Sequence, residues 1–308
     1  MRVVNAQREL VGSMLRCYRE QNGLDLSAAA SILGCDRSKV SRIETGQRGC
    51  QPEELRRLLT GYGVDTAAKD VLAALAGWRE IDGWWRPYLQ SLPGACLAHV
   101  IPEALASRSL IYAPAQVPDL LRIREYDEAI VAADPGLRGG REDVAVQATS
   151  ARQQAVLYER RTRLVVIIGE AALKEQAGGA EVLARQLEHL AGLSGVDYSR
   201  ISIRILPFGA GAHAAGGTGG FSILQFDAIP ELAITHLDGP AGGLCLYEPA
   251  TTEAYLAIFW QLYWFAKGAA ESARVITQMA RRLWQGGAAP LRSRPCVSIA
   301  GGAGRRDC

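Results

Sequence analysis

A short cluster of basic and hydroxyl side chains has the residue types and spacing that most directly indicate chemistry in this chain. The cluster lies between Arg37 and Glu44, which are part of the longer segment 23–49. On a helix that advances about 100° per residue, Val40 and Ile43 fall on one side. The opposite side and its flanks carry Arg37, Ser38, Lys39, Ser41 and Arg42. A helix with a small apolar face and a basic, hydroxyl-rich outer face suits insertion into a DNA major groove.

The elements that must position this cluster are two short helices joined by a tight turn. Asp25 is an N-cap candidate for the first helix, predicted over residues 26–33, and Asp36 is one for the second, predicted over residues 37–44. Gly34 supplies the break between them. The alternative is an αα-hairpin inside a larger helical core, in which the Arg and Lys side chains are merely solvated.

The run RSKVSRIETGQRG resembles the recognition helix and following loop of XRE-type (lambda-repressor-like) helix-turn-helix regulators. The resemblance implies an N-terminal domain of about five helices, at residues 6–21, 26–33, 37–44, 52–62 and 67–79. It also implies that double-stranded DNA is the partner, with Arg37, Ser38 and Arg42 facing base edges. The residues expected nearer the phosphates are Lys39, Ser41, Gln47 and Arg48.

The same resemblance implies an ion pair between Arg19 and Glu44 that supports the second helix. Many relatives bind a phosphate through Gln at the first position of the first helix, where this chain has Leu26. Residues 1–62 contain ten basic and seven acidic side chains, which is a mild excess for a DNA-binding protein. We therefore expect weak, salt-dependent binding by one domain, strengthened by a homodimer on two half-sites.

Length and composition favour two folded domains. The chain has 308 residues, of which 48% are hydrophobic and 21% charged, as in ordinary globular proteins. Its seven scattered Cys residues show no CxxC spacing, which argues for reduced thiols and against a disulfide framework or a zinc site. The most apolar run, residues 255–266, is too short to span a bilayer. These features predict a cytoplasmic protein with no membrane partner, no metal and no cofactor.

The expected domains are a helix-turn-helix domain at residues 1–80, an aromatic connector at 81–99, an α+β domain at 100–285 and a disordered tail at 286–308. Trp84 and Trp85 are expected to lock the two domains together, with stacking on DNA as the alternative. The sheet is predicted to have about five short strands, at residues 163–169, 201–207, 220–226, 232–237 and 244–247. The helices are predicted at residues 101–110, 127–133, 141–160, 181–193, 252–267 and 270–284, and the last two should be buried against the sheet.

Several segments of the second half resemble, in order and spacing, a C-terminal domain of unknown function. That domain occurs in helix-turn-helix proteins of filamentous antibiotic-producing bacteria, the WhiJ-like regulators. The segments are YAPAQVPDLLRIREYDEAI, ARQQAVLYE, GEAALKEQAGG, ILPFGAGAH and GGLCLYEP. The resemblance covers about residues 1–285. It implies a transcriptional regulator of development or secondary metabolism that often acts beside a small acidic partner protein.

Five positions depart from the commoner wording of that family: Asp119, Arg122, Ile123, Asp127 and Glu128. If this segment lines a ligand or partner surface, its specificity has changed. Arg152, in the long helix predicted at residues 141–160, could reach a cleft or pair with a carboxylate.

The Gly-rich stretch 208–220 contains His213 but neither the Lys of a phosphate loop nor the helix that follows a dinucleotide fingerprint. It is an exposed connection, or a loop in which His213 contacts a ligand or acts as a base. Glu248 follows the last strand, either in a solvated turn or at a site. The candidate ligand-binding residues are therefore Asp119, Arg122, Arg152, His213 and Glu248. His99, His189 and His236 are isolated in the sequence, so no metal ligands are assigned.

Three functions fit these observations. The first is a sequence-specific DNA-binding regulator whose second domain senses a small molecule or docks a partner. The second is a cofactor-independent biosynthetic enzyme that has kept the regulator architecture, with its active site in the C-terminal domain, although no catalytic residue can be assigned. The third is a scaffold, similar to an antitoxin, that holds a small partner without binding DNA.

Overall fold

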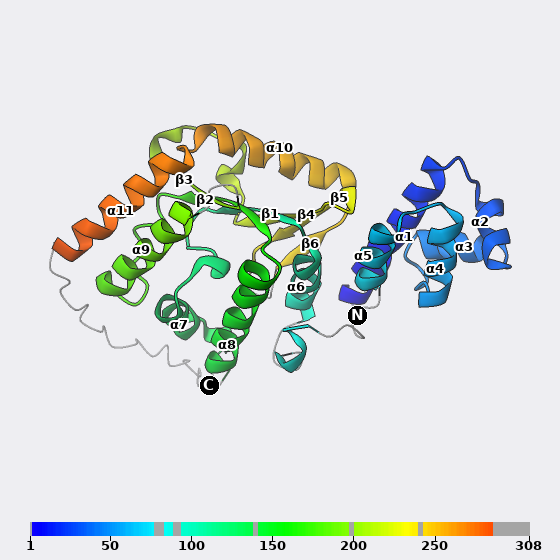
Figure 1. The fold of residues 1–308 in the computed structure, drawn as a ribbon, viewed down its shortest axis with the longest axis horizontal. Coiled ribbons are helices and arrows are strands. Elements are labelled where there is room, and N and C mark those ends of the chain that lie inside the picture. The colour runs from blue at the N-terminus through cyan, green and yellow to red at the C-terminus, as the bar shows by residue number, and fades with distance from the viewer. Residues whose placement is uncertain are drawn as a thin grey trace, which may run out of the picture.

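The computed structural model describes residues 2–76, 83–88, 94–137, 141–196, 200–239 and 243–285. The tail that was expected to be disordered, the end of the fifth predicted helix and parts of the aromatic connector lie outside the described residues. A group of helices at the N-terminus is followed by a sheet with helices on both faces (Figure 1). The described residues thus form an N-terminal helical domain and a C-terminal α+β domain, as predicted.

Side-chain caps delimit the helices of the N-terminal domain. The Asp25 carboxylate accepts a hydrogen bond from the Ala28 backbone N–H at 2.8 Å, and the Asp36 carboxylate accepts one from Lys39 at 3.1 Å. Gly34, with φ of 66°, ends the first of the two capped helices. The described helices are α1 (Arg2–Gln21), α2 (Leu26–Leu33), α3 (Arg37–Glu44), α4 (Pro52–Gly61) and α5 (Thr66–Ala76).

A buried ion pair holds α3 against α1, as the family resemblance implied. Arg19 Nε lies 2.7 Å from Glu44 Oε1, and Arg19 Nη2 donates to Glu44 Oε2 at 2.9 Å. The two side chains are only 9% and 4% exposed. Gly12 allows the close approach of the helices, since a Cβ atom there would lie 2.4 Å from the backbone oxygen of Ile43. The orientation of α3 therefore depends on contacts with α1.

The described strands form one six-stranded mixed sheet in the order β3-β2-β1-β4-β5-β6. β1, β2 and β3 are parallel, whereas β4, β5 and β6 continue the sheet antiparallel from β1. The strands are β1 (Arg108–Ala113), β2 (Arg163–Gly169), β3 (Ile201–Leu206), β4 (Phe221–Phe226), β5 (Ile229–Leu237) and β6 (Leu244–Leu246).

The central strand β1 was not predicted. The sequence pattern had extended a helix over residues 101–110, but α6 (Gly94–Leu105) ends before Ala106, and the chain then enters the middle of the sheet. Five of the six residues of β1 are buried because both faces of the sheet are covered. Such a strand lacks the alternation of polar and apolar residues that distinguishes a strand from a buried helix.

Helices cover both faces of the sheet. α10 (Pro249–Phe265) packs on one face, where Phe259 and Leu262 meet Leu110, Ile167 and Phe221. The opposite face carries a second core that includes Ile111, Val166, Leu187 and Ile276. The helices on that side include α7 (Arg124–Ala133), α8 (Glu142–Gln153) with its π-helical extension Gln154–Glu159, α9 (Ala180–Val196) and α11 (Ala269–Gln285).

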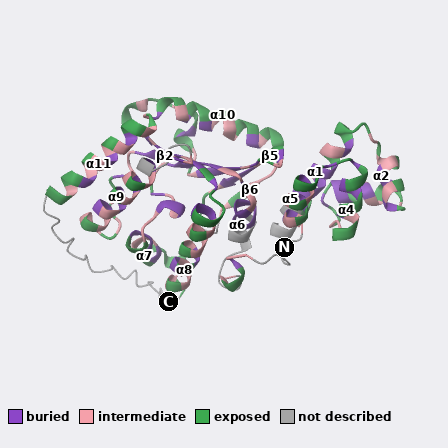
Figure 2. Ribbon diagram, in the orientation of Figure 1, coloured by how far each residue is buried: buried purple, intermediate pink, exposed green. Residues whose placement is uncertain are grey.

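α10 is buried against the sheet, as predicted, but on one side only. Its outer side is largely exposed, as Figure 2 shows. Trp264 is 83% exposed, and Trp260 and Phe265 are also open to solvent. Only the side that faces the sheet is covered, because no described element packs over the outer one.

Buried side chains connect the N-terminal domain with the sheet. One cluster contains Leu10 and Leu72 of the helical domain together with Leu224 of β4 and Ile234 of β5. Helix α6 contacts both α1 and α5. Trp85 is buried against Val100, Ile101 and Ala104 of α6.

We predict that Arg19→Met destabilises the helical domain. The substitution keeps the side-chain length but leaves the buried Glu44 carboxylate without its countercharge, which costs about 3–5 kcal/mol of unfolding free energy. Urea denaturation of the full chain, followed by circular dichroism, measures the loss. Arg16→Met is the matched control because the pair of Arg16 with Glu20 is exposed. Equal stability of the two variants would contradict the role of the buried pair.

Candidate functional site

The outer face of α3 is the first candidate site. Val40 and Ile43 are buried beneath the helix. The opposite face and the following loop leave Arg37, Ser38, Arg42, Gln47 and Arg48 exposed, whereas Lys39 and Ser41 are half-buried. The seven residues expected to contact DNA therefore lie on one helix and its adjoining loop, on the side away from the core.

The side chains of three of these seven residues make contacts within the domain. Lys39 Nζ lies 2.5 Å from Glu54 Oε1 on α4, and the Ser38 hydroxyl is hydrogen-bonded to the Asp36 carboxylate. Arg42 donates from Nε to the Ser38 backbone oxygen at 3.2 Å, which directs its side chain along the helix surface. Phosphate contact by Lys39 would require exchange of its partner Glu54.

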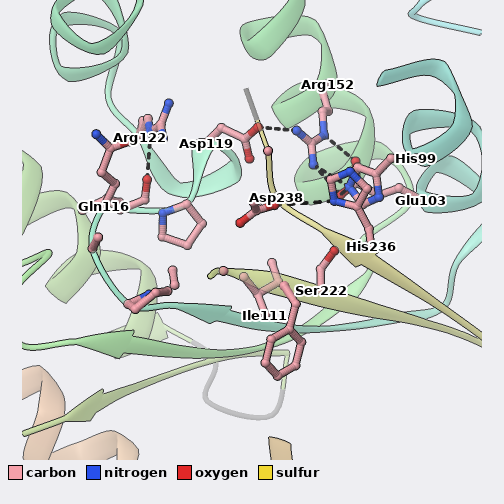
Figure 3. A pocket seen from close by; sticks show the side chains of 18 of the residues that line it. His99, Glu103, Ile111, Gln116, Asp119, Arg122, Arg152, Ser222, His236 and Asp238 are labelled. Carbon is pink, nitrogen blue, oxygen red and sulfur yellow. Dashed lines mark hydrogen bonds and ion pairs between the residues drawn. The ribbon is translucent and has the colours of Figure 1, made fainter. Parts of the chain in front are cut away.

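The second candidate site is a pocket of about 430 Å³ on the face of the sheet opposite α10. It lies between α6, the loop after β1, the start of β4 and the end of β5 (Figure 3). The residues with chemically active side chains that line it are His99, Glu103, Gln116, Asp119, Arg122, Arg152, Ser222, His236 and Asp238. They come from elements far apart in the sequence.

Arg152 of α8 is the charged centre of the pocket wall. Its guanidinium forms a two-point contact with Glu103 of α6, in which Nη2 donates to Oε1 at 2.7 Å. Nη1 donates to Asp119 Oδ2 at 2.5 Å. Burial alone would raise the pKa of Glu103, but the adjacent guanidinium outweighs burial and holds this pKa below its ordinary range. Glu103 is therefore ionised. Arg152 pairs with carboxylates, which was one of the two roles that the sequence suggested for it.

Two histidine rings stack beside this ion-paired group. The centroids of His99 and His236 are 4.0 Å apart and the ring planes differ by 24°. His99 Nε2 lies 3.2 Å from Arg152 Nη2 and 3.4 Å from Glu103 Oε1. Burial lowers the pKa of His99, and the neighbouring His236 lowers it further, so His99 is a neutral imidazole at neutral pH.

Hydrogen bonds fix the loop that forms the other wall. Arg122 donates from Nε to the Val117 oxygen at 2.8 Å, and its Nη1 donates to Asp127 Oδ1 at 3.0 Å. Gln153 donates to the backbone oxygens of Asp119 and Arg122 at 2.6 and 3.0 Å. Three positions that depart from the family wording, Asp119, Arg122 and Asp127, thus belong to one connected group of contacts.

The structure brings together three of the five candidate ligand-binding residues. Asp119, Arg122 and Arg152 line the pocket, whereas His213 and Glu248 do not. His213 precedes a short helical turn that contacts α10, on the other side of the sheet. Glu248 is the residue before α10, where its carboxylate accepts a hydrogen bond from the Thr251 hydroxyl. Its position after a strand end did not place Glu248 in the pocket, because the antiparallel strands of this sheet do not all end on the same side.

The sequence interpretation missed His99, Glu103, His236 and Asp238, and its view of His99 and His236 as isolated is wrong. The available signals were weak ones. His99 and Glu103 are four residues apart on one helix, and His236 and Asp238 stand two apart at the end of a strand. Their meeting depends on how α6 packs on β4 and β6, which local spacing does not reveal.

These features define a class of protein in which a helix-turn-helix domain precedes an α+β domain with a charged, half-enclosed pocket. A family model described as a helix-turn-helix domain matches residues 10–72. The model of a domain of unknown function, DUF5753, matches residues 98–278. The chain belongs to the DUF5753 family and carries a helix-turn-helix domain, which points to a DNA-binding regulator. No curated protein and no solved structure matches it.

Among the described residues, no helix is both long and apolar enough to cross a membrane.

We predict that Arg152→Met unfolds or strongly destabilises the C-terminal domain. Glu103 would be left buried without a countercharge, at a cost of about 3–5 kcal/mol. Arg163→Met is the matched control because the pair of Arg163 with Asp227 is exposed. The measurement is urea denaturation followed by tryptophan fluorescence, since five of the six tryptophans of the chain follow residue 80. Wild-type stability of the Arg152 variant would show that the buried ion pairs do not hold the pocket together.

Proposed function

We propose that the protein is a sequence-specific transcription regulator of the XRE type that binds double-stranded DNA as a homodimer. The observation that carries the proposal is the exposed pair Arg37 and Arg42 on the outer face of α3, a helix whose inner face is buried. The Arg19–Glu44 ion pair supports it by holding the C-terminal end of α3 against α1. Arg side chains at these positions suit hydrogen bonds to guanine in the major groove.

The C-terminal domain is proposed to bind an effector in the pocket around Arg152. A volume of about 430 Å³ suits a small molecule, and polar groups that could orient it lie on both walls, among them Arg152 and Arg122. The mutual pairing of Glu103, Asp119 and Arg152 favours binding over turnover, because paired carboxylates are poor proton acceptors. Genes of development or secondary metabolism as targets, and a small acidic partner protein, rest on the resemblance to WhiJ-like regulators and belong to the same proposal.

The decisive experiment is genomic footprinting of the full-length protein, followed by gel-shift measurements on the recovered sites and on the DNA upstream of its own gene. We expect a sequence-selective shift at low salt that weakens steeply as salt increases, because phosphate contacts release counterions. A protein that produces no selective footprint and no selective shift would refute the regulator function. A scaffold that holds a small partner protein without binding DNA would then be the better explanation.

We predict that Arg42→Ala relaxes sequence discrimination. If Arg42 contacts a base, its loss costs about 1–3 kcal/mol at the cognate site and much less on unrelated DNA. Binding isotherms on cognate and scrambled duplexes measure the difference. Arg56→Ala is the matched control, since Arg56 is an exposed arginine of α4 that pairs with Glu53 of the same helix. A loss of equal size on both duplexes would place Arg42 on a phosphate instead.

A further inference from the structure

Three potential metal ligands meet behind the pocket wall. His99 of α6, His236 of β5 and Cys245 of β6 each offer a ligand atom, and these atoms all lie within 4.8 Å of one another. His236 and Cys245 are register partners on neighbouring strands, so their side chains share one face of the sheet. His99 reaches them from the helix that covers this face. Imidazole nitrogen and thiolate sulfur are the donors that Zn²⁺ prefers.

One nitrogen of His99 is left without a partner. Nδ1 is buried and makes no hydrogen bond, in a side chain that is only 9% exposed. Leaving a buried polar atom unpaired is costly, which makes this atom a candidate for a missing ligand. The opposite nitrogen, Nε2, lies beside Glu103 Oε1. Nε2 also lies 3.2 Å from Arg152 Nη2, which can only donate. Zinc binding at Nδ1 therefore requires the tautomer in which Nε2 donates its proton to Glu103 and the Arg152 guanidinium donates to the carboxylate alone.

His236 also has a carboxylate beside its ring. Its Nδ1 lies 3.5 Å from Asp238 Oδ1, and its Nε2 faces the backbone of Gly243, just before Cys245 in β6. A carboxylate behind each metal-bound imidazole is the usual outer shell of a zinc site, because it fixes the tautomer and strengthens the donor. Here Glu103 would support His99 and Asp238 would support His236.

We propose that His99, His236 and Cys245 bind one Zn²⁺ ion, with a fourth position open toward the pocket. Ligand atoms around tetrahedral zinc are roughly 3.3–3.6 Å apart, so the three ligand atoms need to close by about 1 Å. The two stacked imidazole rings, whose planes differ by 24°, also need to tilt so that one nitrogen of each faces the ion. His99 and His236 also line the pocket, so water or a donor atom of a pocket ligand can complete the coordination. The charge of Arg152 does not oppose the ion, because Glu103 and Asp119 already offset it.

This site goes beyond the regulator function and does not depend on it. The sequence argued against zinc because its cysteines show no paired spacing, but here a single Cys joins two His residues from two other elements. A zinc ion would link α6 to β5 and β6, and α6 also contacts α1 and α5 of the helix-turn-helix domain. Metal binding is measured in the absence of DNA, so a failure of the zinc site and a failure of DNA binding are distinguished on the same full-length protein.

The test is metal titration of the reduced, metal-free full-length protein. We expect one tightly bound Zn²⁺ per chain by mass spectrometry under non-denaturing conditions and by competition with a chromogenic chelator. Co²⁺ in place of Zn²⁺ should give the visible bands of a four-coordinate ion and a thiolate-to-cobalt charge-transfer band in the near ultraviolet. The charge-transfer band reports the Cys ligand directly.

Matched variants separate this site from adventitious binding. Cys245→Ser should abolish the charge-transfer band and weaken zinc binding by more than the 10- to 100-fold typical of outer-shell changes, whereas Asp238→Asn should fall within about that range. Cys35→Ser, which changes a half-buried thiol in the helix-turn-helix domain, should leave both unchanged. Circular dichroism of each metal-free variant verifies that it is folded.

Two results would overturn the proposal. One is the absence of a stoichiometric zinc ion and of a charge-transfer band in the reduced wild-type protein. The other is a cobalt spectrum that is the same in Cys245→Ser as in Cys35→Ser. Should Cys245→Ser fail to fold, His99→Gln provides the second variant, and an unchanged cobalt spectrum in it would equally contradict the site.

Discussion

The buried guanidinium of Arg152 is the interaction on which the C-terminal domain depends. It joins α8 to Glu103 of α6 and to Asp119 in the loop after β1, so three separate segments share one charge. A buried carboxylate without such a partner would take up a proton or move out to solvent. These charges pair with one another at the pocket wall, and the sheet behind them contributes His236 and Ser222 to the lining.

A buried arginine–carboxylate pair is also present in the helix-turn-helix domain, where Arg19 and Glu44 orient α3. In both domains a buried arginine connects helices that the chain separates by 25 residues or more. Helix α6 is the element common to the two halves, because it carries His99 and Glu103 and also contacts α1 and α5. A change at the pocket that moves α6 would therefore act directly on the packing of the DNA-binding domain.

The parts predicted well from sequence are those that local chemistry determines. α2 and α3 were placed correctly because Asp25, Asp36 and Gly34 define their ends through hydrogen bonds within four residues. β1 was missed because a strand covered on both faces loses its alternating pattern. The pocket was found in part, through Asp119, Arg122 and Arg152. His99, Glu103 and His236 escaped because their proximity depends on strand order and helix packing rather than on spacing.

The strand register of β5 and β6 determines whether His99, His236 and Cys245 can meet. β6 has only three residues, and Cys245 is opposite His236 because Leu237 pairs with Leu244. A slip of one residue would turn the thiol to the other face of the sheet, toward α10. So short an edge strand has little pairing energy of its own to hold that register. A metal ion bridging Cys245, His236 and His99 would add the missing specificity, because only one register allows all three donors to meet.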